Sequence, residues 1–540
     1  MLAIRINQPF RRPVFCRPMK AQWLLSGPFF ISRLARGFGP SPVAMGLIII
    51  GAIGLLLAIG GASIADEGET ADSDSLSGLS VAYALEGVLT KVIEQAENSV
   101  VPIAMFREGG VAETSRVIGG RGFRVSDPAS QPRLDAVPDA YGTGVVVSKN
   151  GLILTNAHVL DSGVGSATRI FIRLADRPLW DEVRIKASDP YSDLAVLEGI
   201  APEYAKHNWR PMPLGDGEKV RKGQIVITLG NPFALASDGE VSAGWGIISN
   251  LRRKLPPEQK PIKTPSRPSM HHFGTLIQTD AKLNLGTSGG PLLNLQGKMV
   301  GLTTSLAAIE GHESAAGYAI AVDATFRRAM ALLMEGREVE YGFMGIRPGE
   351  LRWDERIAGQ RGVRVQSVVN GGPAVGRVRR MDVVTHIDGQ RVDSLDALLL
   401  SIGRTPAHQA VELSVLREGR PLTIPVKLTK NRIWGNAVAT VQSPPWRGLR
   451  VEHPAAMRPF SDVWQLPTDC VIVRAVLPGT PADTAGLRPG MQIHRLAEIP
   501  VDSVAVFEQV SQELQGTVSV EVHDMRGGPP RMFELAPQPK

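Results

Sequence analysis

Cysteine and aromatic residues are scarce in this chain of 540 residues. It holds two cysteines, Cys16 and Cys470, and 5% aromatic residues. Two thiols exclude a disulfide framework of the kind that staples small secreted domains, and no group of residues has the spacing of a metal site. We therefore expect cores of aliphatic side chains held by packing alone, and neither a metal nor another cofactor.

Most of the chain also has no excess of positive or of negative charge. The net charge is +6, but residues 1–65 hold seven basic residues and no acidic one. In the remainder, 52 basic residues face 53 acidic ones. The basic face typical of nucleic-acid-binding proteins is therefore missing, and no nucleic-acid partner is expected.

A long uncharged run is present near the start. Residues 43–65 carry no charge, follow a basic leader (1–42) and precede a cluster of acidic residues. As a helix this run would be about 35 Å long, enough to cross a bilayer core of about 30 Å. The charge asymmetry predicts a cytoplasmic leader, a transmembrane anchor and an extracytoplasmic remainder. A signal peptide cleaved after Ala65 is the alternative.

The rest of the chain is long enough for several domains. Residues 66–80 are acidic and rich in Ser and Gly, which predicts a flexible linker. Apolar residues at helical spacing over 81–96 predict an amphipathic helix. Short β-branched runs separated by turn residues follow, and they predict two small antiparallel barrels within a domain over 81–338.

A glycine-rich turn surrounds Ser288, in the sequence Gly-Thr-Ser-Gly-Gly-Pro from Gly286 to Pro291. Glycines cost backbone entropy unless a turn demands them. Acyl transfer supplies one such demand, because the turn would expose a hydroxyl beside backbone N–H groups that stabilise an oxyanion. An incidental serine in a glycine-rich hairpin is the alternative.

Two upstream segments favour the catalytic interpretation. His158 follows an apolar strand, and Asp193 lies at the mouth of another. The order His158, Asp193, Ser288 is one of the known orders of a serine-protease triad. In that template the serine is the nucleophile, the histidine is the base and then the acid, and the aspartate orients the imidazole.

These segments resemble the HtrA/DegP family of trypsin-like serine proteases. The resemblance rests on the runs GTGVVVSKNGLILTNAHVL, SDLAVL, LGNPF and QTDAKLNLGTSGGPLLN and spans roughly residues 95–335. It implies a mainly β, chymotrypsin-like double β-barrel, with His158 and Asp193 from the first barrel and Ser288 from the second. Family members more often carry Asn at the position of Thr287.

The resemblance also implies further site residues. The N–H groups of Gly286 and Ser288 would form the oxyanion hole, and the substrate pocket would be lined by Ile248, Ala315, Ala316 and Gly317. No acidic residue lies at the inferred pocket base, so we expect cleavage after small aliphatic residues rather than after Arg or Lys.

The C-terminal half contains an internal repeat. Val363–Val368 followed by Pro-Ala resembles Val471–Val476 followed by Pro-Ala, which predicts two domains, at 339–430 and 431–540. Both resemble PDZ domains, which bind C-terminal peptides as an added strand. The implied carboxylate loops are Phe343, Met344, Gly345 and Ile346 in the first and Arg447, Gly448 and Leu449 in the second. The first copy lacks the glycine that normally precedes the acidic residue at Asp382.

The leading hypothesis is an ATP-independent endopeptidase of the cell envelope that cleaves unfolded proteins and whose PDZ domains bind substrate or activator peptides. The family resemblance implies a homotrimer or a higher oligomer, built in part by the 81–96 helix. Two alternatives stay open: a chaperone or peptide-binding scaffold with a silent protease, and a site-specific regulatory protease in envelope stress signalling.

Overall fold

The computed structural model describes residues 70–107, 138–161, 168–175, 177, 179–232, 239–254, 269–304, 317–457, 466–467, 469–524 and 529–538. The chain divides into two units, Met1–Val81 and Ala82–Lys540. The leader, the expected anchor over 43–65 and Cys16 lie outside the described residues. Within the described part, no helix is both long and apolar enough to cross a membrane.

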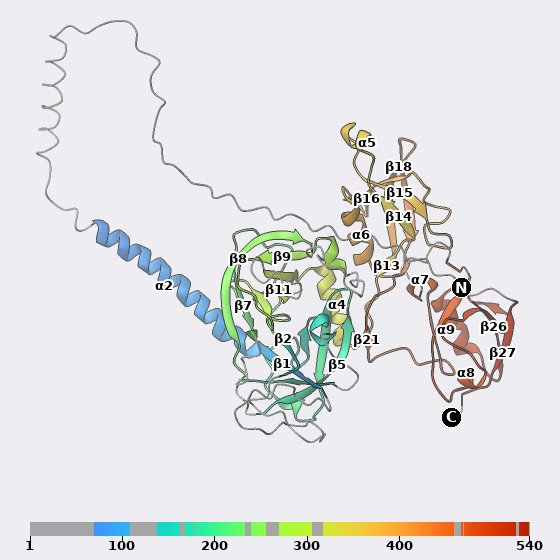
Figure 1. The fold of residues 1–540 in the computed structure, drawn as a ribbon, viewed down its shortest axis with the longest axis horizontal. Coiled ribbons are helices and arrows are strands. Elements are labelled where there is room, and N and C mark those ends of the chain that lie inside the picture. Colours follow the sequence, from blue (N-terminus) through green and yellow to red (C-terminus); the bar gives the residue numbers. More distant parts are fainter. Residues whose placement is uncertain are drawn as a thin grey trace, which may run out of the picture. The chain divides into compact units, whose positions relative to one another are not determined.

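The first described helix is α2 (Thr70–Ala96), the blue helix of Figure 1. It contains the helix expected over 81–96 but begins eleven residues earlier, so 70–80 is helical rather than a flexible linker. Its last turns are anchored, because Val92 and Ala96 are buried in one core cluster with Val100. Once a helix is nucleated by such packing, each further residue adds a hydrogen bond at low cost.

The first barrel follows α2. Its strands run in the order β5-β4-β1-β2-β3-β6, and β5 also pairs with β6, so the sheet closes on itself. Its interior is aliphatic, with Tyr204 and Trp209 as added aromatic members. The strands are β1 (Val100–Arg107), β2 (Ala140–Val146), β3 (Ile153–Thr155), β4 (Thr168–Ile172), β5 (Asp181–Asp189) and β6 (Leu194–Gly199), with α3 (Ala157–Asp161) after β3.

The second barrel is closed in the order β10-β11-β12-β9-β8-β7. The two antiparallel barrels predicted from the β-branched runs are thereby confirmed. The strands are β7 (Ile225–Gly230), β8 (Ser242–Arg253), β9 (Leu276–Thr279), β10 (Pro291–Leu293), β11 (Met299–Thr304) and β12 (Gly317–Ala321), with the 3-10 turn η4 (Met270–Phe273) before β9. Helix α4 (Ala324–Met334) comes next, capped by the Asp323 carboxylate, which accepts the Phe326 N–H at 2.8 Å.

Each C-terminal domain is an antiparallel sheet with one main helix. We call them PDZ1 and PDZ2; their sheets run β14-β15-β16-β18-β19 and β22-β23-β24-β26-β27, with β17 and β25 in matching side positions. This equivalence confirms the internal repeat.

In PDZ1 the elements are β13 (Gly342–Phe343), β14 (Ile346–Gly349), α5 (Trp353–Ile357), β15 (Val363–Val368), β16 (Val383–Ile387), β17 (Gln390–Arg391), α6 (Leu395–Arg404), β18 (Ala410–Arg417), β19 (Arg420–Lys427) and β20 (Thr429–Lys430). In PDZ2 they are β22 (Leu449–Glu452), α7 (Pro454–Met457), β23 (Val471–Val476), α8 (Pro481–Thr484), β24 (Gln492–Leu496), β25 (Ile499–Pro500), α9 (Val504–Glu513), β26 (Val518–His523) and β27 (Arg531–Leu535). The serines that precede α6 and α9 cap them alike, through Ser394 and Ser503.

One strand departs from the expected domain division. The sequence places residues 431–446 in PDZ2, but β21 (Val438–Ala439) within them pairs with β5 of the first barrel. The register places Val438 opposite Ser188 and Ala439 opposite Ala187. The connection between the PDZ domains is thus a seventh strand of the protease sheet.

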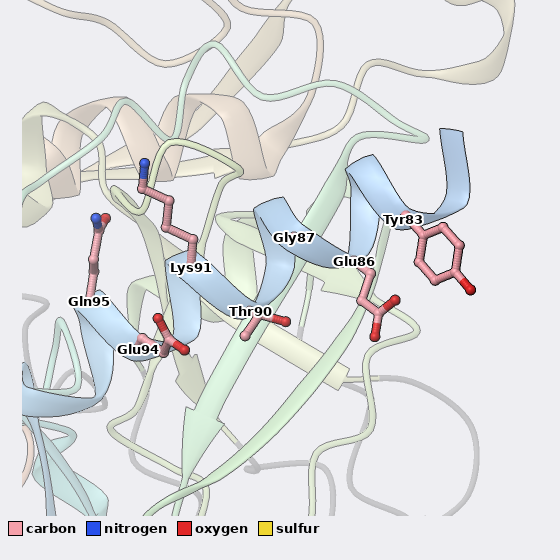
Figure 2. A pocket seen from close by; sticks show the side chains of 7 residues that line it. All are labelled: Tyr83, Glu86, Gly87, Thr90, Lys91, Glu94 and Gln95. Carbon is pink, nitrogen blue, oxygen red and sulfur yellow. The ribbon is translucent and has the colours of Figure 1, made fainter. Parts of the chain in front are cut away.

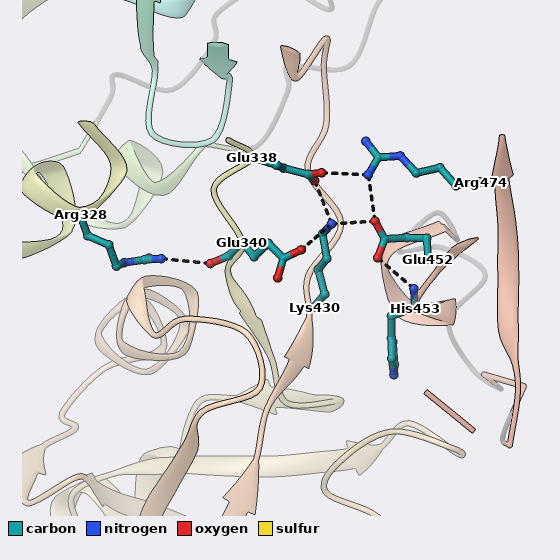
Figure 3. A network of polar contacts seen from close by, with 7 residues as sticks. All are labelled: Arg328, Glu338, Glu340, Lys430, Glu452, His453 and Arg474. Carbon is teal, nitrogen blue, oxygen red and sulfur yellow. Dashed lines mark hydrogen bonds and ion pairs between the residues drawn. The ribbon is translucent and has the colours of Figure 1, made fainter. Parts of the chain in front are cut away.

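An ion network around the buried Lys430 joins the segment that precedes PDZ1 to both PDZ domains. The ammonium of Lys430 lies 2.9 Å from Glu338, 3.0 Å from Glu340 and 2.6 Å from Glu452, and Arg474 lies 2.8 Å from Glu338. Burial opposes the charge, but the three carboxylates outweigh it and raise the pKa of Lys430. Figure 3 shows these side chains converging from PDZ1, PDZ2 and the segment that precedes PDZ1.

Candidate active site

The barrels bring His158, Asp193 and Ser288 together. The His158 Nδ1 atom lies 2.8 Å from Asp193 Oδ2 and 3.0 Å from Oδ1, and His158 Nε2 lies 3.2 Å from Ser288 Oγ. Asp193 also accepts the backbone N–H of His158 at 2.9 Å. The expected nucleophile, the expected base and the group expected to orient that base are therefore within hydrogen-bond reach of one another.

Each of these residues occupies a short connection between strands. His158 lies in α3, directly after β3, and Asp193 lies between β5 and β6. Ser288 lies between β9 and β10 of the second barrel. This division between the barrels is the one that the family resemblance implied.

The glycines around Ser288 are required by close packing. Gly286 has φ +94°, and a Cβ there would lie 2.2 Å from the Asn231 carbonyl oxygen. Gly289 has φ +87°, and a Cβ there would lie 2.1 Å from the Thr143 carbonyl oxygen. A side chain at either position would need both a left-handed backbone and space that backbone atoms already occupy.

Threonines hold the backbone of this turn in place. The hydroxyl of Thr143 donates to the Gly286 carbonyl at 2.7 Å and accepts the Asn231 N–H at 2.9 Å. The hydroxyl of Thr303 donates to the Thr287 carbonyl at 2.6 Å. Thr287 itself donates its hydroxyl to the Asn284 carbonyl at 2.7 Å, so this departure from the usual family residue still closes the turn. These contacts restrict the direction of the Gly286 and Ser288 peptides, the expected oxyanion donors.

Two buried groups that sequence reasoning missed lie beside Asp193: Asp189 at the end of β5 and His271 in η4. Asp189 is fully buried, and burial raises the pKa of its carboxyl group. His271, also fully buried, lies with Nε2 3.0 Å from the Ser192 carbonyl oxygen and Nδ1 2.6 Å from the Thr275 hydroxyl. Burial lowers the pKa of His271, which keeps this ring neutral. No local motif identifies these residues, because their partners lie far away in the sequence or in another element.

The expected substrate pocket is only partly within the described residues. Ala315 and Ala316 lie outside them. Gly317 opens β12, where a Cβ would lie 2.8 Å from the Leu283 side chain. Ile248 was placed on the pocket wall, but its side chain is fully buried in the core of the second barrel. Its neighbour Ile247 is 37% exposed and is the residue of β8 that faces outward there.

The two expected carboxylate loops precede edge strands, β14 in PDZ1 and β22 in PDZ2. An edge strand has free backbone groups to which a peptide strand can be added. In PDZ1, Met344 is buried in the domain core and Gly345 has φ +76°. Phe343 is the last residue of β13, and Ile346 is the first residue of β14.

The PDZ2 loop is built differently. Arg447 has φ +50°, and its guanidinium donates to the Leu535 carbonyl at 2.5 Å and to the Leu514 carbonyl at 3.4 Å. Its charge is therefore turned into the domain, and only its backbone remains in the loop. Gly448 has φ +89°, and the Leu449 N–H donates to the Trp446 carbonyl at 2.8 Å.

A separate hollow lies along one face of α2. Its lining comes from that helix alone: Tyr83, Glu86, Gly87, Thr90, Lys91, Glu94 and Gln95. Figure 2 shows these side chains fanning out along the helix rather than converging on a point. We assign no chemistry to it.

Comparison with known proteins agrees with this architecture. A trypsin-like peptidase domain model matches residues 142–302, and a PDZ domain model matches residues 342–428. A probable periplasmic serine endoprotease DegP-like of Ectopseudomonas mendocina is 31% identical over 406 residues, which cover 72% of this chain and 78% of that protein. This chain belongs to the HtrA/DegP family of serine endoproteases.

Other relatives of the HtrA/DegP family extend the match. A DegP-like protein of Hahella chejuensis is 28% identical over 474 residues, which cover 83% of this chain and 92% of the relative. Among solved structures, the HtrA-type protease AlgW with a decapeptide is 24% identical over 64% of this chain and 98% of its own, with a TM-score of 0.46. As a family member, the chain is a serine endopeptidase with a trypsin-like protease domain and PDZ domains.

Proposed function

We propose that this protein is an ATP-independent endopeptidase that cleaves unfolded proteins through Ser288, His158 and Asp193. The observation that carries the proposal is the pair of contacts made by the imidazole, 2.8 Å to Asp193 and 3.2 Å to Ser288. Both are short enough for hydrogen bonds, and they connect the three groups in the order that general-base catalysis needs.

In this mechanism Ser288 Oγ attacks a peptide carbonyl while His158 Nε2 takes its proton. Asp193 holds the Nδ1–H and stabilises the imidazolium that forms. The N–H groups of Gly286 and Ser288 would receive the negative charge of the tetrahedral intermediate. His158 then protonates the leaving amine, and the same steps with water release the acyl group.

The specificity and partners of the enzyme are also proposals. We infer a pocket for small aliphatic residues, with Gly317 at one wall and Ala315 and Ala316 beside it. Exposed C-terminal peptides of unfolded substrates or activators would bind as an added strand at β14 or β22. A homotrimer or higher oligomer would use α2, whose Val81, Tyr83 and Val88 are exposed apolar residues.

For location, we infer the cell envelope, because the relatives above are named periplasmic endoproteases. The uncharged run over 43–65 would anchor the chain in the inner membrane, or would be removed as a signal peptide. A protease domain outside the cytoplasm has no ATP supply, which fits a mechanism that needs none.

The test is cleavage of casein by the wild-type protein and by Ser288→Ala, with and without hydrophobic C-terminal peptides. We expect cleavage that disappears in Ser288→Ala and that the peptides stimulate. If neither protein cleaves casein but both suppress aggregation of an unfolded client, the protein acts as a chaperone and the proposal is wrong. A profile of cleaved bonds with Arg or Lys before the cut would refute the aliphatic pocket.

A further inference from the structure

The backbone of Asp193 is held in an unfavourable conformation. Its φ is +55°, in the left-handed region that costs energy for residues other than glycine. The Asp193 carbonyl accepts the Ala157 N–H at 3.1 Å and the Asn156 side-chain amide at 3.2 Å. Such a conformation persists only where the surroundings determine it, so the residues that hold this turn also place the carboxylate that faces His158.

The carboxylate of Asp189 organises the turn from the other side. It accepts the N–H groups of Tyr191 and Ser192, both at 3.2 Å, and the Ser192 hydroxyl at 2.5 Å. A buried carboxylate needs such donors, because leaving it under-bonded is costly. Ser192 is the residue directly before Asp193, so Asp189 fixes the peptide from which Asp193 projects.

The remaining donor to Asp189 comes from another part of the chain. Tyr341, fully buried, donates its hydroxyl to Asp189 Oδ2 at 2.5 Å. Burial raises the pKa of Tyr341 well above its usual value, so the hydroxyl keeps its proton and stays a donor. Tyr341 directly precedes β13 of PDZ1, and its carbonyl accepts the N–H of Asn431, the residue after β20, at 2.7 Å.

Other PDZ1 contacts reach the same turn. The Tyr191 and Tyr341 rings meet edge to face with centroids 4.6 Å apart. A Cβ on Gly403 of α6 would lie 2.3 Å from the Tyr191 hydroxyl, so only a residue without a side chain fits there. Beside it, Arg404 pairs with Asp323 of the protease domain at 2.8 Å. The segment entering PDZ1 and its main helix therefore rest on the turn that carries Asp193.

We propose that Tyr341 is a positioning residue of the protease, whose hydroxyl holds the Asp189–Asp193 turn and thereby the carboxylate that orients His158. This proposal rests on the proposed role of the triad. It makes the catalytic geometry depend on PDZ1 being seated against the protease domain, because Tyr341 holds Asp189 and directly precedes β13 of PDZ1.

The test compares Tyr341→Phe with wild type in the full-length protein. Only the hydroxyl is lost, so the ring packing stays while Asp189 loses a donor. We expect kcat for a chromogenic peptide to fall about tenfold with KM changed less than twofold, since orientation and not substrate binding is affected. Binding of a C-terminal peptide to PDZ1, measured by fluorescence anisotropy, should not change.

Tyr204→Phe is the matched control. Tyr204 is also buried in the protease domain and donates its hydroxyl to a backbone carbonyl, that of Gly151, at 2.6 Å. It should lower thermal stability as Tyr341→Phe does but leave kcat unchanged. Equal kcat in Tyr341→Phe and wild type, or a parallel loss of kcat in both variants, would overturn the proposal.

A second measurement covers the case in which Tyr341→Phe folds poorly. Initial rates are divided by the folded fraction, which circular dichroism gives for both proteins at several temperatures below the unfolding transition. A kcat per folded molecule equal to that of wild type would count against the proposal. Ser288→Ala separates the two proposals. Residual cleavage by Ser288→Ala would refute the triad. An inactive Ser288→Ala together with a normal kcat in Tyr341→Phe would refute only the positioning role of Tyr341.

Discussion

PDZ1 and PDZ2 make the same turn with different residues. In PDZ2 the turn before β24 contains Gly490 at φ +95°, whose N–H donates to the Val473 carbonyl at 2.8 Å. In PDZ1 the equivalent residue is Met381, with φ +76° and an N–H that donates to the Val365 carbonyl at 2.9 Å. The fold therefore requires the left-handed conformation, and PDZ1 adopts it without the glycine that makes it inexpensive.

The next residue shows how PDZ1 tolerates this. Asp382 is buried and accepts the Arg379 N–H at 2.8 Å and the Arg417 guanidinium at 2.9 and 2.8 Å. In PDZ2 that position is Met491, whose sulfur meets the Arg488 N–H at 3.4 Å. In PDZ1 the contacts of the buried Asp382 thus compensate for the unfavourable backbone conformation of Met381. PDZ2 has glycine at that position and needs no such contacts.

The largest difference between the domains should come from removing the Asp382 contacts. Asp382→Ala removes three hydrogen bonds to a buried carboxylate, two from Arg417 and one from the Arg379 N–H, and we expect the free energy of opening PDZ1 to fall by about 3 to 5 kcal/mol. Hydrogen exchange of the β15 and β16 amides in the full-length protein measures this. Asp393→Ala is the control, because its pair with Arg391 is exposed and should contribute less than about 1 kcal/mol. If the two substitutions had similar effects, Asp382 would not stabilise PDZ1 in the way described.

Acid should lower the stability of PDZ2 by somewhat less than Asp382→Ala lowers that of PDZ1. Burial lowers the pKa of His453 from 6.5 to about 4, with smaller effects of His408 and Lys430. As the pH falls from about 6.5 to about 4, the unfolded chain binds a proton that folded PDZ2 does not. The free energy of unfolding should therefore fall by about 3 kcal/mol over this range and be unaffected above it.

Amide exchange in PDZ2 between pH 7 and pH 4.5, corrected for intrinsic rates, tests this expectation. His453→Asn removes the titrating ring but keeps an acceptor for the Ala455 N–H, which His453 Nδ1 accepts at 3.2 Å. That variant should lose most of the pH dependence. An unchanged pH dependence in His453→Asn would assign the effect to other groups.

Exchanging the turn residues should have the smallest effect. Met381→Gly relieves the backbone of PDZ1 and should raise its stability by about 1 kcal/mol, whereas Gly490→Met should lower that of PDZ2 by at least about as much. We expect slower amide exchange in PDZ1 of Met381→Gly and faster amide exchange in PDZ2 of Gly490→Met. If Met381→Gly destabilises PDZ1, packing of the half-exposed methionine outweighs its conformation.

Local sequence was sufficient for the parts of the molecule that depend on short segments. The glycines around Ser288 predicted a tight turn whose backbone conformation excludes other residues. The order of His158, Asp193 and Ser288 indicated which loops meet. Tyr341 and His271 were not predictable, because each acts on a partner reached only through the tertiary fold. Ile248 was misplaced for a similar reason: the β8–β9 register shifts between Ile248 and Asn250, and such an irregularity changes which residues face inward.

Strand β21 has a consequence for how substrates meet the protease. Because Val438 and Ala439 belong to the protease sheet, the stretch that leads to β22 of PDZ2 is only residues 440–448, which span at most about 30 Å when extended. A short tether turns a second encounter into an intramolecular one, with a local concentration in the millimolar range. A polypeptide whose end is bound by PDZ2 would thus be presented to the protease domain at a concentration far above that of free substrate.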